Sequence, residues 1–563
     1  MIDPTAPGAF AGAFVTALRR LGLRHACISP GARNTSLSLA LVRSGVTTWV
    51  HHDERSSAFF ALGLARATAA PVALACTSGT AAAEYLPALV EGRASRVPLV
   101  VLTADRPPEL RDVGAPQSID QVKMYGDAVK WFHDVGVVDV ASVTAAPHLA
   151  AHVWTLAEDV PAGPVHVNFP FREPLDVETE TEGLGAPPTT MRGPIIPGEA
   201  ELTEVTSMIT GKKVLVVAGA VEDEVFAPTV ADLAARLQAP VHADPLSGLR
   251  HGAHDRTQII SGSDLLVAAG WLDMARPDVV LRFGAVPTSK ALWSWLEARP
   301  DVPQIVVDAA GWRDPTRSAR LVVRGDPHAV AEGLAKMAVA GPAGWWEEWR
   351  AARTAASAVV DEVLAGGGRL SEPAIARLLT ATSQGILGVA SSMPIRDVDA
   401  FGVTTSAALR YVANRGANGI DGTISMTLGA LAGAASPGRL LIGDVAALHD
   451  LTALRTAARL RIPLTTVVVH NDGGGIFHFL PHADLVDSEE FERVFGTPHG
   501  TDFVAIAAAM EVASARVGSS TELVDALEHL EPPALIEVTT DREENLALHR
   551  GVVVGVAGAL ARL

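Results

Sequence analysis

The sequence contains little cysteine and comparatively few basic residues. Only Cys27 and Cys76 occur in 563 residues, each within an apolar run (HACIS and VALACTS), so we expect two buried thiols rather than a disulfide. Asp and Glu (63) outnumber Lys and Arg (45), giving a formal net charge of −18. This balance argues against nucleic-acid binding, which usually requires a basic surface. A local group of arginines could still bind anionic small molecules.

Long hydrophobic runs are also absent. No stretch of 18 purely apolar residues occurs, so no membrane span is predicted. The N-terminus, MIDPTAPGAF, lacks the basic start and apolar stretch of a signal peptide, and we therefore expect a cytoplasmic protein. Hydrophobic residues make up 48% of the chain, and its length exceeds what one hydrophobic core can organise, so about three domains are expected.

What the sequence does contain is an alternation of short apolar, β-branched runs with longer Ala- and Leu-rich segments. This alternation is typical of βα units and parallel sheets. The candidate strands are HACIS, PVALACT, VPLVVLTA and GPVHVNFP in the first third; KKVLVVAGA, PVHADP, DLLVAAG, DVVLRFGA, PQIVVDAAG and ARLVVRGDP in the middle; and GILGVAS, RLLIGD, PLTTVVVHND and PALIEVTT in the last third. The predicted fold is α/β, with three doubly wound parallel-sheet domains.

Two features predict the domain boundaries. Residues 175–198 are rich in Pro, Gly, Thr and acidic residues, which indicates a linker. A predicted helix in GPAGWWEEWRAARTAASAVVDEVLAGGGRL ends at three glycines, 366–368. The predicted domains are 1–180, 181–345 (linker and middle domain) and 346–563. No GxGxxG follows a strand of the middle block, so no dinucleotide site is predicted there.

Polar residues follow the predicted strands at the ends where open α/β sheets bind ligands. They are Arg33 in SPGARN, the TSGT of 77–80, Arg106 in TADRPPEL, Asp444 in GDVAALHD and Asn471 in HNDGGGIF. For any one of these loops, a turn that the fold requires is as good an explanation as a binding site. Five of them together favour a binding site.

Asp444 and Asn471 form a more specific pair, because they follow neighbouring predicted strands and stand 27 residues apart. A carboxylate, an amide oxygen and a carbonyl in a glycine turn suit Mg²⁺, which completes its octahedron with phosphate oxygens and water. Gly473–Gly475 would let the backbone approach a diphosphate closely. Residue types alone leave a second reading equally open, in which Asp444 caps the following helix and Asn471 forms a turn.

These motifs resemble those of thiamine diphosphate-dependent enzymes. In that family a glutamate before a helix lies in the first, pyrimidine-binding α/β domain, and the GD…N motif lies in the last, diphosphate-binding one. Within the family, the resemblance is to the menaquinone-biosynthesis branch that joins 2-oxoglutarate to isochorismate with loss of CO₂. The segments that carry it are ISPGARN, HHDERSSAFFALGLA, TSGTA, TADRPPELRDVGAPQSIDQ, GPVHVNFPFREPL, SSMPIRDVD, NRGANGIDGTIS, IGDVAALHDL and HNDGGGIFHFLP.

The resemblance implies a role for each matching residue. Glu54 would be the catalytic residue, because a carboxyl on the aminopyrimidine ring of the cofactor promotes its tautomerisation. The implied metal ligands for Mg²⁺ (or Mn²⁺) are Asp444, Asn471 and Gly473, and the implied cofactor-binding residues are Glu54, Ile420, Gly443, Ile476 and Phe477. The implied substrate-binding residues are Arg33, Arg106, Gln117, Lys290, Ser392, Arg396 and Arg415. Arginine suits dicarboxylates because its planar fork binds them bidentately.

Each of these residues also has a purely structural interpretation. A single arginine can serve a salt bridge, and Ile420, Ile476 and Phe477 can be ordinary core residues. Val445 stands where many of these enzymes have a glycine after the GD pair. Pro116 stands where the resemblance leads us to expect an asparagine beside Gln117, and proline has no side-chain donor for a substrate hydrogen bond.

The resemblance also implies a homo-oligomer, which would be at least a dimer and, as in related enzymes, a tetramer. Two rival functions remain: another thiamine diphosphate carboligase, similar to acetolactate synthase, and a non-catalytic relative.

Overall fold

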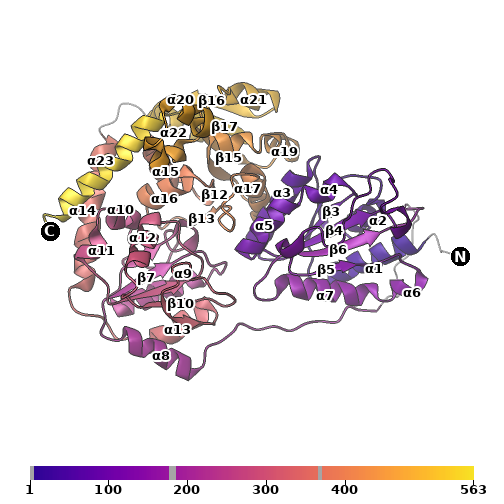
Figure 1. Cartoon of the computed structure of the whole chain (residues 1–563), viewed down its shortest axis with the longest axis horizontal. Helices are drawn as coiled ribbons and strands as arrows, with labels where there is room; N and C mark the ends of the chain where they lie inside the picture. Colours follow the sequence, from indigo (N-terminus) through magenta and orange to yellow (C-terminus); the bar gives the residue numbers. More distant parts are fainter. Residues whose placement is uncertain (1–4, 176–184, 366–369) are drawn as a thin grey trace. The chain divides into compact units, whose positions relative to one another are not determined.

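The computed structural model describes residues 5–175, 185–365 and 370–563 (Figure 1). The chain forms two compact units. Unit 1 comprises Met1–Arg192, Asn414–Ser436 and His449–Ile462; unit 2 comprises Gly193–Ala413, Pro437–Leu448 and Pro463–Leu563. Each unit is therefore assembled from segments far apart in the sequence.

Unit 1 contains a six-stranded parallel sheet in the order β2-β1-β3-β4-β6-β5. Its strands are β1 His25–Ile28, β2 Thr47–Val50, β3 Val72–Cys76, β4 Leu99–Asp105, β5 Phe132–Asp134 and β6 Val165–Pro170. Its helices are α1 Ala6–Leu21, α2 Thr35–Arg43, α3 Glu54–Thr68, α4 Thr80–Ala83, α5 Leu86–Ser95, α6 Val140–Val143, α7 Ala146–Glu158, α17 Thr423–Ala434 and α19 Thr452–Leu460.

Unit 2 contains two parallel sheets. The first has the order β11-β10-β9-β7-β8, with β7 Val214–Ala218, β8 Val241–Ala243, β9 Val279–Phe283, β10 Gln304–Val307 and β11 Ala319–Val323. The second has the order β13-β12-β14-β15-β17-β16, with β12 Gly385–Val389, β13 Leu409–Val412, β14 Gly438–Gly443, β15 Leu464–His470, β16 Ala513–Val517 and β17 Ala534–Thr539.

The helices of unit 2 connect these parallel strands. They are α8 Glu199–Ile209, α9 Phe226–Leu237, α10 Ser263–Ala268, α11 Trp271–Met274, α12 Lys290–Ala298, α13 Pro327–Met337, α14 Trp345–Ala365, α15 Glu372–Thr382, α16 Met393–Phe401, α18 Asp444–Leu448, α20 Ser488–Phe491, α21 Phe503–Ala509, α22 Ser520–His529 and α23 Arg542–Leu560. In the described residues, no helix combines the length and apolarity needed to cross a membrane.

The predicted α/β class, with three parallel sheets and interleaved helices, is confirmed. Cys27 and Cys76 are both buried free thiols, as expected. One predicted strand is wrong: DLLVAAG forms helix α10, because a short apolar run cannot distinguish a buried strand from a buried helical turn. The glycines 366–368 lie outside the described residues, and the three-domain boundaries stay a prediction.

Within unit 1, α17 packs against α3, and Figure 1 shows the two helices side by side. Glycines allow this close approach on both sides of the contact. A Cβ on Gly63 of α3 would lie 1.8 Å from the carbonyl oxygen of Met426, and a Cβ on Gly429 of α17 would lie 1.9 Å from that of Phe60. Only glycine fits at either position, so the two backbones hold each other at a fixed separation.

Gly63→Ala should force α3 and α17 apart. We expect it to destabilise unit 1 by about 1–3 kcal/mol, as overpacking of a core does, despite the better helix propensity of alanine. Thermal unfolding followed by circular dichroism measures the loss. Gly551→Ala on α23 is the matched control, because a Cβ there meets nothing within 4 Å. Equal melting temperatures for the two variants would contradict the close-packing argument.

Candidate functional site

Asp444 links the carboxyl ends of β14 and β15. It follows β14 directly, and its side chain is 2% exposed. Its Oδ2 accepts hydrogen bonds from the backbone N–H groups of Asn471 (3.1 Å) and Gly473 (3.0 Å), and its Oδ1 accepts one from Val445 (2.7 Å). Burial raises the pKa of Asp444, and the N–H groups of Gly473 and Val445 oppose that rise. The helix-capping interpretation is thus partly right, but Asp444 also organises the next loop.

Asn471 shows how the second predicted ligand is oriented. Its Nδ2 donates to Oε1 of Glu372 at 2.8 Å. Its Oδ1 is buried and has no hydrogen-bond partner among the described residues. A buried acceptor without a partner is costly, and a cation is one group that would satisfy it.

The two glycines beside the predicted metal ligands differ in the space around them. A Cβ on Gly443 would meet no atom within 4 Å, so there is free space next to the backbone at the end of β14. Gly473 has φ +141°, and a Cβ there would lie 1.8 Å from the carbonyl oxygen of Gly496. The Asp444 carboxylate, the unpartnered amide oxygen of Asn471 and the glycine carbonyl are the hard-oxygen donor types that Mg²⁺ prefers.

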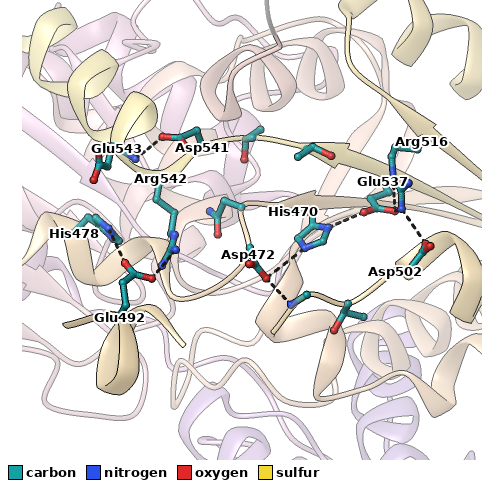
Figure 2. Close-up of a pocket in the computed structure, with 15 residues that line it drawn as sticks. His470, Asp472, His478, Glu492, Asp502, Arg516, Glu537, Asp541, Arg542 and Glu543 are labelled. Atoms are coloured by element: carbon teal, nitrogen blue, oxygen red, sulfur yellow. Dashed lines mark hydrogen bonds and ion pairs between the residues drawn. The ribbon is translucent and has the colours of Figure 1, made fainter. Parts of the chain in front are cut away.

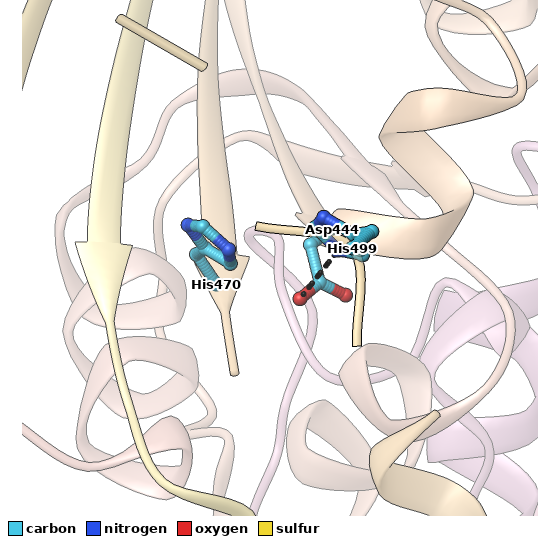
Figure 3. A group of neighbouring side chains, drawn as sticks. All are labelled: Asp444, His470 and His499. Carbon is cyan, nitrogen blue, oxygen red and sulfur yellow. Dashed lines mark ion pairs between the residues drawn. The ribbon is translucent and has the colours of Figure 1, made fainter. Parts of the chain in front are cut away.

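Two histidines also approach Asp444, as Figure 3 shows. Nε2 of His499 lies 3.4 Å from Oδ2 of Asp444, and Nδ1 of His470 lies 2.7 Å from Oε1 of Glu537. The backbone N–H of Thr501 donates to Nδ1 of His499, which places the ring proton on Nε2, facing the carboxylate. Nε2 of His499 is buried and makes no hydrogen bond to a described residue, so its contact with Asp444 is a close approach of two polar groups and not a hydrogen bond.

A cavity of about 660 Å³ lies over the carboxyl ends of β15 and β17 (Figure 2). Asn471 is the one predicted site residue in its lining. The charged residues around it are mostly acidic, and its two arginines are each paired with a glutamate: Arg542 with Glu492 at 2.8 Å, and Arg516 with Glu537 at 3.0 Å. A negatively charged wall does not suit a dicarboxylate, so this cavity does not match the predicted substrate site; Asn471 places it beside the predicted metal ligands.

Other predicted substrate residues of unit 2 lie at helix starts. Ser392 precedes α16 with the rare φ of +75°, and Arg396, one turn later, donates to its carbonyl oxygen. Burial lowers the pKa of Arg396, and the nearby carboxylates of Asp397 and Asp264 oppose the change. Strained backbone of this kind is frequent at ligand sites. Lys290, the first residue of α12, is exposed.

In unit 1, Glu54 is the first residue of α3 and is half-buried. Asp53 caps the helix by accepting a hydrogen bond from the N–H of Ser56 at 3.0 Å. Burial raises the pKa of Glu54, its own backbone N–H opposes the rise, and the Asp53 and Glu84 carboxylates add to it. A carboxyl whose pKa is raised holds a proton more readily than a free glutamate does, which suits a group that exchanges a proton.

Arg33, Arg106 and Gln117 lie in the loops after β1 and β4. Arg33 is 5% exposed and donates to the carbonyl oxygen of Phe171 (3.1 Å) and to Oε1 of Glu173 (3.0 Å). Gln117 has φ +57°, and its Nε2 donates to the carbonyl oxygen of Ser78 at 2.9 Å. Arg106 is half-buried, and its Nε has no hydrogen-bond partner among the described residues.

The Arg415 loop belongs to the same unit and is held by Glu91. Oε1 of Glu91 accepts from the N–H of Gly416 (2.9 Å) and from Arg66 (2.9 Å), and Oε2 accepts from the N–H of Ala417 (2.7 Å). Arg415 and Ile420 are both half-buried. Unit 1 thus contains Glu54 and four of the predicted substrate-binding residues, while unit 2 contains the predicted metal ligands.

Ile476 and Phe477 lie in the short helix Gly475–Phe479 of unit 2, and both are half-buried. The ring of Phe477 packs against that of Phe495, with centroids 5.6 Å apart. Phe477 therefore makes a packing contact of the kind that an ordinary core residue makes. The cofactor-binding role of Ile476 and Phe477 stays a prediction.

Sequence reasoning missed two buried acids that support the site. Glu372 follows a Ser cap and precedes a Pro, a pattern that indicates only a helix start. Asp450 lies between α3 and α17: its Oδ2 accepts from the N–H of Ser425 at 2.7 Å, and its Oδ1 accepts from the Ser56 hydroxyl at 3.3 Å. No local pattern marks either acid, because each acts on a residue distant in the sequence.

Comparisons with known proteins agree with this arrangement. The model of the thiamine pyrophosphate enzyme N-terminal TPP binding domain matches residues 9–124, and the model of the corresponding C-terminal TPP binding domain matches residues 401–538. The chain is 41% identical to the 2-succinyl-5-enolpyruvyl-6-hydroxy-3-cyclohexene-1-carboxylate synthase of Chloroflexus aurantiacus, over 98% of this chain and 96% of that protein. It is 43% identical to the synthase of the same name from Geobacillus thermodenitrificans, over 98% and 97%.

Asp450 should make unit 1 less stable as the pH rises. Burial raises the pKa of Asp450 to about 7, from about 3.9 for a free aspartate. Its stabilising contribution is therefore complete below about pH 4 and is lost as the pH rises through about 7. Asp450→Asn removes this titration. We expect the wild-type melting temperature to fall relative to that of the variant between about pH 5 and pH 8. A constant difference across that range would contradict the assignment.

Proposed function

Because this chain belongs to the 2-succinyl-5-enolpyruvyl-6-hydroxy-3-cyclohexene-1-carboxylate synthase family of thiamine pyrophosphate enzymes, we propose that it adds 2-oxoglutarate to isochorismate with loss of CO₂. This is a transferase reaction of menaquinone biosynthesis. The observation that carries the proposal is the identity of about two residues in five over nearly the whole length of the chain and of its relatives. The arrangement of arginines and buried acids supports it.

The cofactor supplies the hard chemistry: when bound, thiamine diphosphate provides the nucleophilic carbon and the electron sink for decarboxylation. Glu54 is proposed to exchange a proton with its aminopyrimidine ring. The half-buried position of Glu54 and its raised pKa support this role, because they make the carboxyl hold a proton more readily than a free glutamate does.

The metal is proposed to be Mg²⁺ or Mn²⁺, held by Asp444, Asn471 and the carbonyl oxygen of Gly473. The buried Asp444 carboxylate and the unpartnered Oδ1 of Asn471 support this ligand set. Gly443, Ile420, Ile476 and Phe477 are proposed to contact the cofactor itself, a role compatible with the free space beside Gly443.

The substrates are dicarboxylates, and the proposed binding residues are rich in positive charge. They are Arg33, Arg106, Gln117, Lys290, Ser392, Arg396 and Arg415. Arg33 already donates a hydrogen bond to the exposed carboxylate of Glu173, so its guanidinium is oriented to bind a carboxylate. We further propose a homo-oligomer, at least a dimer and in this family a tetramer, that works in the cytoplasm.

Glu54→Gln tests the catalytic role. The variant keeps the shape of the side chain but cannot share a proton as a carboxyl does, so we expect kcat to fall by about 10²–10⁴-fold with an unchanged melting temperature. Asp53→Asn is the matched control, because Asn caps a helix as well as Asp does, and it should keep most of the activity. Near-full turnover by the Glu54 variant would refute the assignment.

Substrate identity is tested with purified protein, isochorismate and either 2-oxoglutarate or pyruvate, with and without thiamine diphosphate and Mg²⁺. We expect loss of isochorismate and release of CO₂ only with 2-oxoglutarate and both cofactors, because the proposed site carries several arginines for two dicarboxylates. Product formation is followed by liquid chromatography. Turnover of pyruvate alone would indicate an acetolactate-synthase-like enzyme, and cofactor binding without turnover would indicate a non-catalytic relative.

A further inference from the structure

The amide of Asn471 has one end fixed and the other end free. Its Nδ2 donates to Oε1 of Glu372 at 2.8 Å, while its Oδ1 is buried with no hydrogen-bond partner among the described residues. The two ends of an amide differ chemically, since the NH₂ group only donates and the oxygen only accepts. Whatever fixes the NH₂ end therefore also decides where the oxygen points.

Glu372 is well placed to fix it. The side chain belongs to the first residue of α15 and is 3% exposed. Its Oε1 also accepts the hydroxyl of Thr540 at 3.0 Å, which holds the carboxyl from the end of β17. A flipped Asn471 would lose the hydrogen bond that its NH₂ group now donates, and it would set its own oxygen against Oε1, which already accepts the Thr540 hydroxyl.

We propose that Glu372 is a positioning residue that holds the Asn471 amide with its oxygen toward the metal. The inference rests on the proposed function, because it assigns Asn471 to the metal. Groups that orient metal ligands in this way commonly change metal affinity 10–100-fold when they are removed. Glu372 touches neither metal nor substrate, so its loss should change metal affinity and leave the reaction at saturating metal nearly intact.

The first experiment measures Mg²⁺ binding by isothermal titration in the presence of saturating thiamine diphosphate. For Glu372→Ala we expect the Mg²⁺ dissociation constant to rise about 10–100-fold, with kcat at saturating Mg²⁺ close to that of the wild type. Asp314→Ala is the matched control: Asp314 is a buried acid bonded to Thr316 and Ala319 in the middle sheet, and its loss should lower the melting temperature without changing Mg²⁺ affinity.

A charge exchange distinguishes orientation from mere support of the fold. Asp at position 471 has two equivalent oxygens, and beside Glu372 it places two carboxylates together, so Asn471→Asp alone should bind Mg²⁺ poorly. Adding Glu372→Gln restores a hydrogen bond with donor and acceptor exchanged. We expect the double variant to bind Mg²⁺ at least tenfold more tightly than Asn471→Asp alone, whereas Glu372→Gln in the wild-type background should not improve binding.

Two outcomes would overturn the inference while leaving the proposed function in place. One is wild-type Mg²⁺ affinity in Glu372→Ala; the other is an effect of Glu372→Gln that has the same size and sign in both backgrounds. A wild-type protein that binds no Mg²⁺ in the presence of thiamine diphosphate would overturn the proposed metal site, and this inference with it.

Discussion

The unit 2 site depends on the hydrogen bonds that the Asp444 carboxylate accepts from the loop after β15. Parallel strands bring their carboxyl ends to one edge of a sheet, but they do not by themselves order the loops that follow. Asp444 does this by accepting two N–H groups of the loop after β15, those of Asn471 and Gly473. The end of β14 and the loop after β15 are thereby held in one arrangement before any ligand is present, which lowers the entropic cost of binding.

The two units position their polar side chains in different ways. In unit 2, buried acids and backbone N–H groups orient an amide and a carboxylate, and burial raises the pKa of Glu372 to about 8, with the nearby Asp397 carboxylate adding to the rise. In unit 1, a helix contact made by glycines sets the position of α3, and the cap of that helix precedes Glu54. Proposed ligand groups in both units are thus supported by residues that would not touch a ligand.

Most strands and the main polar loops could be predicted from the sequence, because buried central strands are continuous apolar runs. The four strands that were missed, β2, β5, β13 and β16, all lie at sheet edges. Exposed or half-buried positions interrupt the apolar pattern of β2, β5 and β16, and Arg410 interrupts that of β13. The loops with Arg33, Asp444 and Asn471 were found because each follows a central strand. Glu372, Asp450 and Glu91 were not, since their partners lie in distant parts of the sequence and only the folded chain brings them together.

The contact between α3 and α17 also bears on how the protein is synthesised. Unit 1 includes residues 414–436 and 449–462, so the partner of α3 leaves the ribosome long after α3 itself. At about 5–20 residues per second, the delay is on the order of tens of seconds. During that time the face of α3 that packs on α17 in the folded protein is not covered by α17.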